Sequence, residues 1–229
     1  MSARLIFPLF LGLVGAAILI GLGTWQLQRL SWKQDILAAI DSRIVADPVP
    51  LPAEPDQTRD QYLPVTVRGR LTGEDLDVLV SRKQQGAGYR VIAVLETEGR
   101  RVMVDRGFLP EALRAAPRPT GDITVGGNLL WPQEVDSYTP APDAARKIWF
   151  ARDVPVMAAA LDAQPVLIVS RTSDPADPAV QPMAVDGANI PNDHLQYAIT
   201  WFLLAVVWLG MTGLMVWRIW RPTPDQGDA

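Results

Sequence analysis

The only histidine of this 229-residue chain, His194, lies where the sequence changes from polar to apolar, within PNDHLQYAITWFLLAVVW (Pro191–Trp208). Neutral imidazole is the commonest side-chain ligand for metal ions in proteins. Tyr197 and Trp201 follow at spacings of three and four residues, so on a helix the three side chains share one face. This pattern is typical of a metal-binding or cofactor-binding face. A lone histidine near a helix start is also typical of a polar cap or a surface residue.

The remaining reactive side chains exclude most other chemistry. The chain has no cysteine and one histidine, which excludes zinc fingers, iron–sulfur clusters and two-histidine metal centres. The sequence has no GxSxG elbow, no phosphate-cradling glycine loop, and no nucleophile visibly matched to a base. The net charge of −4 and the pI near 5.0 argue against nucleic-acid binding through a basic face. We therefore predict a protein that is not an enzyme and does not bind nucleic acid.

Two uncharged apolar runs, residues 5–28 and 195–217, are long enough to cross a bilayer. A hydrocarbon core of about 30 Å requires about 20 helical residues. The first run exceeds the apolar core of a signal peptide and lacks a convincing cleavage site, so we predict an uncleaved anchor. Both runs are therefore predicted to be transmembrane helices.

Positive charges beside the spans predict the orientation. Arg218 and Arg221 follow the second span at once, which places both chain ends in the cytoplasm. Arg29 and Lys33 oppose this orientation, but the long segment between the spans is exported largely regardless of charge. We therefore expect a multi-pass protein of the cell (inner) membrane with its large domain on the periplasmic side. The predicted divisions are residues 1–4 and 218–229 in the cytoplasm, 5–28 and 195–217 as spans, 29–46 as a helical extension and 47–194 as the exported domain.

The first helix is predicted to continue beyond the membrane. Leu30, Leu37 and Ile44 recur every seven residues among charged and polar ones, which is the pattern of an amphipathic helix. Within the first span, Gly21 and Gly23 are predicted to allow another helix to approach closely.

The segment between the spans contains about seven short strand-like runs and one short helix. Glu98-Gly99-Arg100 predicts a hairpin turn, and Gly126-Gly127 predicts a bulge or a close backbone contact. Asp153 is predicted to cap the short helix. The predicted strands are residues 62–71, 77–83, 89–97, 101–108, 123–130, 147–151 and 165–171, with a break at 86–88. The predicted fold class is a membrane α+β protein, in which two transmembrane helices bracket an exported antiparallel β-rich domain of the sandwich or barrel type.

In an antiparallel pair of spans, the end of the first helix and the start of the second lie at one level. The candidate site at the outer membrane face then consists of Trp25, Gln26, Arg29, His194, Tyr197 and Trp201. A flat, apolar, metal-bearing ligand with acidic edges suits this set. Haem is such a ligand, with His194 as the axial ligand and Arg29 near a propionate. The same residues fit an interfacial aromatic belt and a helix–helix seam equally well.

Three motifs resemble those of the Surfeit locus protein 1 family. GTWQLQRLSWK (Gly23–Lys33) resembles the family signature at the end of the first span. VDRGFLP (Val104–Pro110) is similar to the strand-end motif RGW-x-P, with Phe108 in place of the usual Trp. NDHLQYAITWF (Asn192–Phe202) resembles the motif N-x-H-x-x-Y-A-x-T-W-F at the second span. The resemblance covers nearly the whole chain and is weakest at residues 110–184.

The resemblance implies an assembly factor, or chaperone, for cytochrome c oxidase that assists the delivery of haem a to subunit I or its insertion there. Some family members are associated with haem a binding through the histidine that His194 matches. The implied cofactor is haem a, and the implied partners are oxidase subunit I, haem a synthase and membrane lipid. The alternative is a membrane scaffold that stabilises an oxidase assembly intermediate without binding haem.

Overall fold

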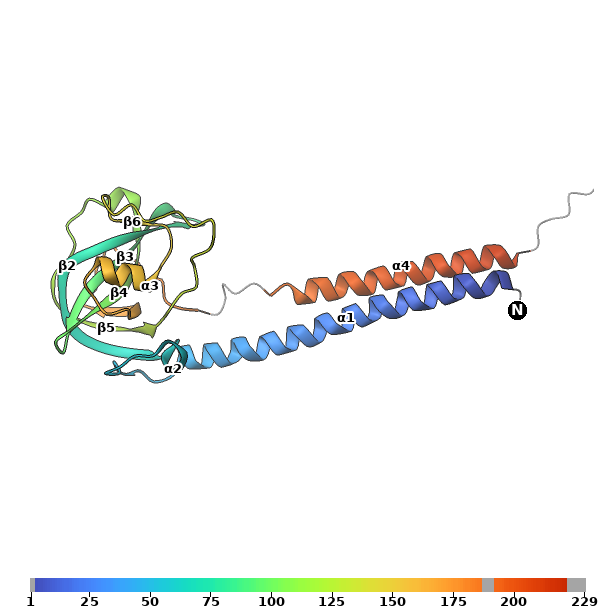
Figure 1. The fold of residues 1–229 in the computed structure, drawn as a ribbon, viewed down its shortest axis with the longest axis horizontal. Helices are drawn as coiled ribbons and strands as arrows, with labels where there is room; N and C mark the ends of the chain where they lie inside the picture. The colour runs from blue at the N-terminus through green and yellow to red at the C-terminus, as the bar shows by residue number, and fades with distance from the viewer. Residues whose placement is uncertain (1–2, 187–191, 222–229) are drawn as a thin grey trace, which may run out of the picture. The chain divides into compact units, whose positions relative to one another are not determined.

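The computed structural model describes residues 3–186 and 192–221, which divide into two units (Figure 1). Of the described residues, those within Met1–Ala38 and Ala188–Ala229 form the helical unit. Those within Ala39–Gly187 form the β unit. The helical unit holds both apolar runs, and the β unit holds all the predicted strands.

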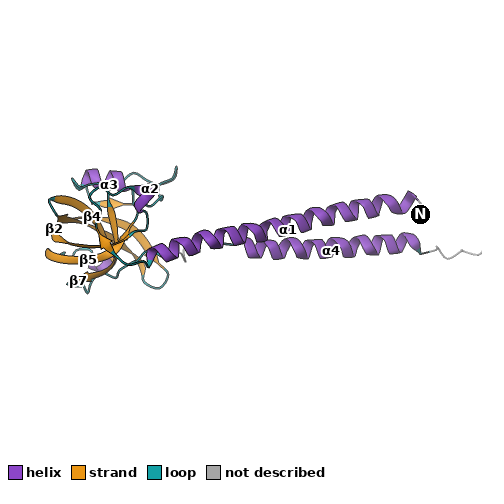
Figure 2. Ribbon diagram, turned by 90° about the horizontal axis from the view of Figure 1, so that it is seen from below, coloured by secondary structure: helices purple, strands orange, loops and turns teal. Residues whose placement is uncertain are grey.

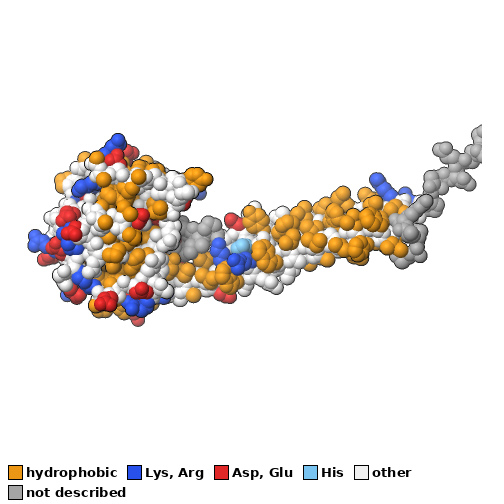
Figure 3. Space-filling model, in the orientation of Figure 1, with side chains coloured by type: hydrophobic (Ala, Val, Ile, Leu, Met, Phe, Trp, Pro, Cys, Tyr) orange, Lys and Arg blue, Asp and Glu red, His pale blue; other side chains and the backbone are white. Residues whose placement is uncertain are grey.

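The helical unit consists of α4 (His194–Trp220) and the part of α1 (Ala3–Ile44) up to Ala38. The two helices lie side by side in both ribbon views and run in opposite directions (Figures 1 and 2). Both are long and apolar enough to cross a membrane, and most of their apolar side chains are exposed (Figure 3). Such a surface suits hydrocarbon better than water. The predicted α+β class, with two apolar helices bracketing a sheet-rich unit, is confirmed.

α1 continues past its apolar run as far as Ile44. The helix predicted from the seven-residue spacing of Leu30, Leu37 and Ile44 is therefore present. Within the β unit, the carbonyl oxygen of Ile44 accepts hydrogen bonds from the side chains of Asn128 and Arg171, at 2.9 and 2.7 Å. These bonds satisfy one of the carbonyl groups that the end of a helix leaves without an intrahelical partner.

The β unit follows the order of elements that the sequence pattern indicates, but two predicted strands join into one and an additional two-residue strand precedes them. Its strands are β1 (Val49–Pro50), β2 (Pro64–Arg82), β3 (Gly86–Thr97), β4 (Arg100–Pro110), β5 (Gly121–Leu129), β6 (Ile148–Trp149) and β7 (Leu167–Asp174). Its helices are α2 (Gln57–Asp60), a 3₁₀ turn (Glu111–Leu113) and α3 (Val154–Ala160).

The sheet closes on itself because β2 pairs with both β3 and β5, and the other strands complete the cycle β2–β3–β4–β7–β5. Four of these contacts are antiparallel, and the β4–β7 contact is parallel. β1 and β6 each add a short parallel pairing to β2. The predicted antiparallel sheet is therefore wrong at three pairings. Parallel neighbours need a long crossover, and the chain between β4 and β7 supplies one through β5, β6 and α3.

β2 forms one continuous strand over residues that were predicted as two. Its register with β3 shifts between Leu71 and Asp75, where Gly73 has a φ of +88°, in the left-handed region that favours glycine. Residues 64–71 pair with β5, and residues 70–82 pair with β3 on the opposite edge. The irregularity therefore interrupts the register without ending the strand, and this shared strand closes the sheet.

The predicted turns are found with one change of position. Glu98 and Gly99 have positive φ values of 49° and 72° and connect β3 to β4 as a hairpin. The register between β5 and β7 shifts between Gly126 and Gly127, which confirms the predicted bulge. The break predicted at residues 86–88 is wrong in position. The turn between β2 and β3 lies at residues 83–85, and Gly86 is the first residue of β3.

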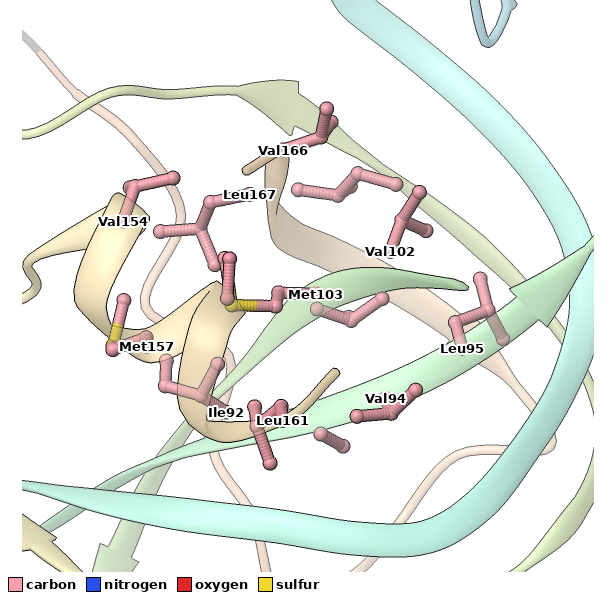
Figure 4. Close-up of a cluster of buried hydrophobic side chains, with 14 of the residues drawn as sticks. Ile92, Val94, Leu95, Val102, Met103, Val154, Met157, Leu161, Val166 and Leu167 are labelled. Carbon is pink, nitrogen blue, oxygen red and sulfur yellow. The ribbon is translucent and has the colours of Figure 1, made fainter. Parts of the chain in front are cut away.

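α3 belongs to the main core of the β unit. Its predicted cap is confirmed, because the Asp153 carboxylate accepts a hydrogen bond from the backbone N–H of Val156 at 3.3 Å. Met157 of α3 lies in one buried cluster with Met103 and Leu167 from two strands of the sheet (Figure 4). All three side chains are fully buried. The short helix therefore contributes to the core of the β unit.

The VDRGFLP segment lies at the end of β4 and is almost entirely buried. The Arg106 guanidinium pairs with Asp177 at 3.0 Å, and both side chains are more than nine-tenths buried. Burial lowers the pKa of Arg106, and the Asp177 carboxylate opposes that effect. The backbone of Phe108 exchanges two hydrogen bonds with that of Gln181, at 2.7 and 2.8 Å. The segment thus fastens the chain that follows β7 to the end of β4.

Asp105 in the same segment pairs with two arginines from other parts of the chain. Its fully buried carboxylate accepts from Arg90 of β3 at 2.5 Å and from Arg152 at 3.2 Å. Arg152 also donates to Glu134 at 2.5 Å. A buried carboxylate with two guanidinium partners is costly to expose or to leave unpaired, so this network holds the segment before α3 against the β3–β4 hairpin.

Gly107→Ala is expected to destabilise the protein strongly. Gly107 has a φ of +113°, and a Cβ atom there would lie 2.1 Å from the Gln181 carbonyl oxygen. Backbone strain costs about 1–3 kcal/mol, and overpacking adds about 1–3 kcal/mol. The midpoint of thermal unfolding of the full chain in detergent should fall by several degrees. Gly99→Ala is the matched control, because Gly99 also has positive φ but open space around it. Equal losses in both variants would contradict the close contact with Gln181.

Candidate functional site

The contact between α1 and α4, here called the seam, is built on small residues. The buried positions include Gly12, Ala16 and Gly23 of α1 and Ala198 and Ala205 of α4. Their spacings of four and seven residues keep each set on one face of its helix. Small side chains on facing helices let the backbones approach closely, which is a main route to helix association in hydrocarbon.

Aromatic side chains of α4 fill the space that the glycines of α1 leave open. A Cβ atom on Gly15 would lie 2.4 Å from the Trp208 indole nitrogen, and one on Gly23 would lie 2.7 Å from the Phe202 ring. Trp208 also donates its indole N–H to the Gly12 carbonyl oxygen at 3.0 Å. The seam therefore combines close packing with a hydrogen bond between the helices.

The prediction of a close approach at Gly23 is confirmed, and the one at Gly21 is wrong. No atom lies within 4 Å of the Cβ position of Gly21. Residues two apart on a helix point about 200° apart, so only one of these glycines can face α4. Gly12, Gly15 and Trp208 were not among the predicted contact residues, although the small residues at 12, 16 and 23 recur on one face.

His194 is the first residue of α4 and contacts Gln26 of α1. Its Nδ1 lies 2.8 Å from the Gln26 Oε1, and both residues are half-buried. An amide oxygen only accepts hydrogen bonds, so a neutral imidazole makes this bond when its Nδ1 carries the proton, and its Nε2 then keeps a lone pair. The contact engages one ring nitrogen and leaves the other available to a ligand.

Apart from Gln26, none of the predicted site residues is joined to His194 by a hydrogen bond or ion pair among the described residues. Tyr197 and Trp25 have exposed fractions of 56% and 53%, and Trp201 is half-buried. The Arg29 guanidinium lies 4.1 Å from the centroid of the Trp32 ring on its own helix. The structure thus brings together one pair of the predicted set.

Tyr197 lies beside the seam rather than in it. Ala198 is 1% exposed, whereas Tyr197 is mostly exposed. Successive helical residues are rotated by about 100°, so only one of these neighbours can face α1. The seam continues from His194 through Ala198, and the phenol remains on the outer side of the helix.

Asn192, two residues before His194, carries an unsatisfied polar atom. Its Oδ1 is buried and has no hydrogen-bond partner among the described residues. In contrast, the hydroxyls of Thr24 and Thr200 bond to backbone carbonyls four residues earlier, at 2.8 and 2.9 Å. A buried acceptor without a partner costs about 1–3 kcal/mol, and such groups require an explanation such as a bound ligand or water. A hydrogen-bond donor on a ligand would relieve this cost.

The donor set at His194 could hold a metal only if that metal brought most of its own ligands. The described residues contain no group of three or more His, Cys, Asp and Glu side chains that could hold a metal ion. A single imidazole nitrogen cannot enclose a bare ion. Haem requires only one axial ligand from the protein besides its porphyrin nitrogens, and the available Nε2 of His194 fits this requirement.

Comparison with known proteins gives matches over most of the chain. A family model described as the SURF1 family matches residues 13–206. Surfeit locus protein 1 from Homo sapiens is 30% identical over 211 residues, which cover 81% of this chain and 69% of the human protein. The protein of that name from Rattus norvegicus is 28% identical over 207 residues, covering 80% and 67% of the two chains. The SURF1-like protein from Monosiga brevicollis is 29% identical over 212 residues, covering 83% and 80%.

Gly23→Leu is expected to separate α1 from α4 near His194, because the new side chain would overlap the Phe202 ring. A variant with Gln26→Cys and His194→Cys can be cross-linked by a short bismaleimide where the two positions are close. The chain has no native cysteine that could react in their place. Adding Gly23→Leu should lower the cross-linked fraction in membranes several-fold. Adding Gly21→Leu, at an open position, should leave it unchanged. Equal cross-linking in the two backgrounds would argue against the close approach.

Proposed function

Because the chain belongs to the SURF1 family, we propose that it is an assembly factor for cytochrome c oxidase that assists haem a delivery to, or insertion into, subunit I. The family model covers residues 13–206, which include all three motifs that carry the resemblance. In this proposal His194, at the start of α4, ligates the haem iron.

The hydrogen bond between His194 and Gln26 is the observation that carries the proposal. It engages Nδ1 at 2.8 Å, so Nε2 would be the ring nitrogen that binds iron. Haem, when bound, supplies the iron and a flat apolar ring. The residues of the chain would orient the imidazole, contact the ring and neutralise the acidic edge.

Aromatic and cationic side chains beside this pair suit the two kinds of surface that haem presents. Tyr197 and Trp25 each expose more than half of their surface and would contact the apolar ring. Arg29 stacks on Trp32, and a stacked guanidinium keeps its edge N–H groups for a carboxylate. Among the described residues, Arg29 forms no salt bridge with a carboxylate.

We propose the cell (inner) membrane as the location, with the β unit on the periplasmic side. Arg218 and Arg221 after the second apolar run and the long acidic segment between the runs support this orientation. Oxidase subunit I is the proposed recipient of haem a, and haem a synthase is the proposed donor. Membrane lipid would contact the exposed apolar faces of α1 and α4. The proposal requires no bond-breaking chemistry.

A scaffold that stabilises an oxidase assembly intermediate without binding haem is the second candidate. Gly21 of α1 and Gly210 and Gly213 of α4 have no atom within 4 Å of their Cβ positions. Small residues on an outward helix surface let a helix of another membrane protein approach. Both candidate functions use the same two helices, and the haem content of the purified protein separates them.

Protein purified from a host that makes haem a is expected to carry haem and to show its absorption bands. His194→Ala should lose most of this absorbance, because the axial bond to iron is removed. Gln196→Ala is the control, since Gln196 is an exposed neighbour on the same helix, and it should keep the wild-type spectrum. Full haem occupancy in His194→Ala would refute the ligand role. A colourless wild-type protein that still co-purifies with subunit I would favour the scaffold.

The proposed orientation predicts which engineered cysteines an impermeant maleimide reaches in spheroplasts. Tyr138→Cys should react in intact spheroplasts, because Tyr138 is 90% exposed in the β unit. Gln226→Cys, in the tail outside the described residues, should react only after lysis. The absence of native cysteine removes the background. The reverse labelling pattern would show that the β unit is cytoplasmic.

A further inference from the structure

We propose that Gln26 is a positioning residue, which holds His194 as the Nδ1–H tautomer and thereby presents Nε2 to the haem iron. The tautomer is a property of the haem-free protein, whereas its use in haem binding rests on the proposed function. Gln26 does not touch the iron in this inference. It acts through the imidazole of His194, 2.8 Å away.

The tautomer follows from what Gln26 can offer. Neutral imidazole carries one ring proton, and the hydrogen bond at one nitrogen decides where that proton resides. Gln26 presents an amide oxygen to Nδ1 of His194, and this oxygen can accept but not donate. The Nε2–H tautomer would make a hydrogen bond only after the Gln26 amide turned over to present its NH2 group to Nδ1.

The close packing of α1 and α4 in the seam brings the Gln26 side chain within contact distance of His194. Gly23 lies about one turn before Gln26 and packs against the Phe202 ring, so the two helix backbones are close at this level. Gln26 and His194 are both half-buried, which reduces competition from water for their hydrogen bond. Gln26→Asn keeps the amide but shortens the side chain by one methylene, and it should therefore lose the contact.

The uncharged side chain of Gln26 determines how strongly His194 would bind iron. Metal-bound histidines usually donate their second N–H to a carboxylate, a carbonyl or water, and a carboxylate makes the imidazole more basic. Gln26 lies in an apolar run, residues 5–28, that contains no charged residue. A glutamine orients His194 without placing a charge there, and it gives an axial ligand of intermediate strength. Such a ligand suits haem that is received and then released.

The single histidine of the chain makes the tautomer directly measurable. Full-length, haem-free protein labelled with ¹⁵N only at histidine, in lipid nanodiscs, should give one pair of ring signals at a pH where free imidazole is neutral. We expect the Nδ1–H pattern in the wild type, and the Nε2–H pattern or an average of both in Gln26→Leu. Gln28→Leu, at an exposed position on the same helix, is the control and should match the wild type. An Nε2–H pattern in the wild type, or no change in Gln26→Leu, overturns the inference.

Titration with haem a tests the second half of the inference. Gln26→Leu should weaken haem binding by about 10- to 100-fold, the usual cost of removing the partner of a metal-bound histidine. Gln26→Glu should restore the affinity and shift the haem reduction potential to a more negative value. Wild-type affinity in Gln26→Leu overturns the positioning role. A wild-type protein that binds no haem a overturns the proposed function instead, and the tautomer is then decided by the NMR spectra alone.

Discussion

Hydrocarbon gives two apolar helices no hydrophobic reason to associate, so close packing and internal hydrogen bonds must hold α1 against α4. The glycines of α1 supply the space, and Phe202 and Trp208 fill it. The same close approach brings Gln26 within hydrogen-bond distance of His194. The candidate site therefore depends on the seam. A substitution that separates the helices near Gly23 should also break the hydrogen bond between Gln26 and His194.

Patterns among neighbouring residues predicted the elements of the fold better than their pairing. The continuation of α1 to Ile44, the hairpin at Glu98-Gly99 and the cap at Asp153 depend on residues close together in the sequence. The union of two predicted strands into β2 and the parallel pairing of β4 with β7 depend on distant partners. Met103, for example, pairs with Leu167, more than sixty residues away. Hydrophobic periodicity carries no information about such pairs.

The candidate site was predictable to a similar extent. Aligning the ends of the two apolar runs placed Gln26 near His194, and the structure joins them. Periodicity gives the face of α4 only to within about a third of a turn, and the structure places Ala198 rather than Tyr197 in the seam. The VDRGFLP segment was recognisable as a motif, but only the structure shows that Gly107 is required by the backbone of a distant segment.

The closed sheet restricts how another protein can engage the β unit. Both edges of β2 are occupied: Val65 pairs with β1 and β5, and Asp77 pairs with β3 and β6. Each other strand of the cycle also has a neighbour on two sides. Strand addition, in which an extended peptide joins an exposed edge, thus finds no long free edge among the described strands. A protein that binds the β unit must therefore contact its side chains and loops. The specificity of such binding would depend on which residues form that surface and not on backbone hydrogen bonds.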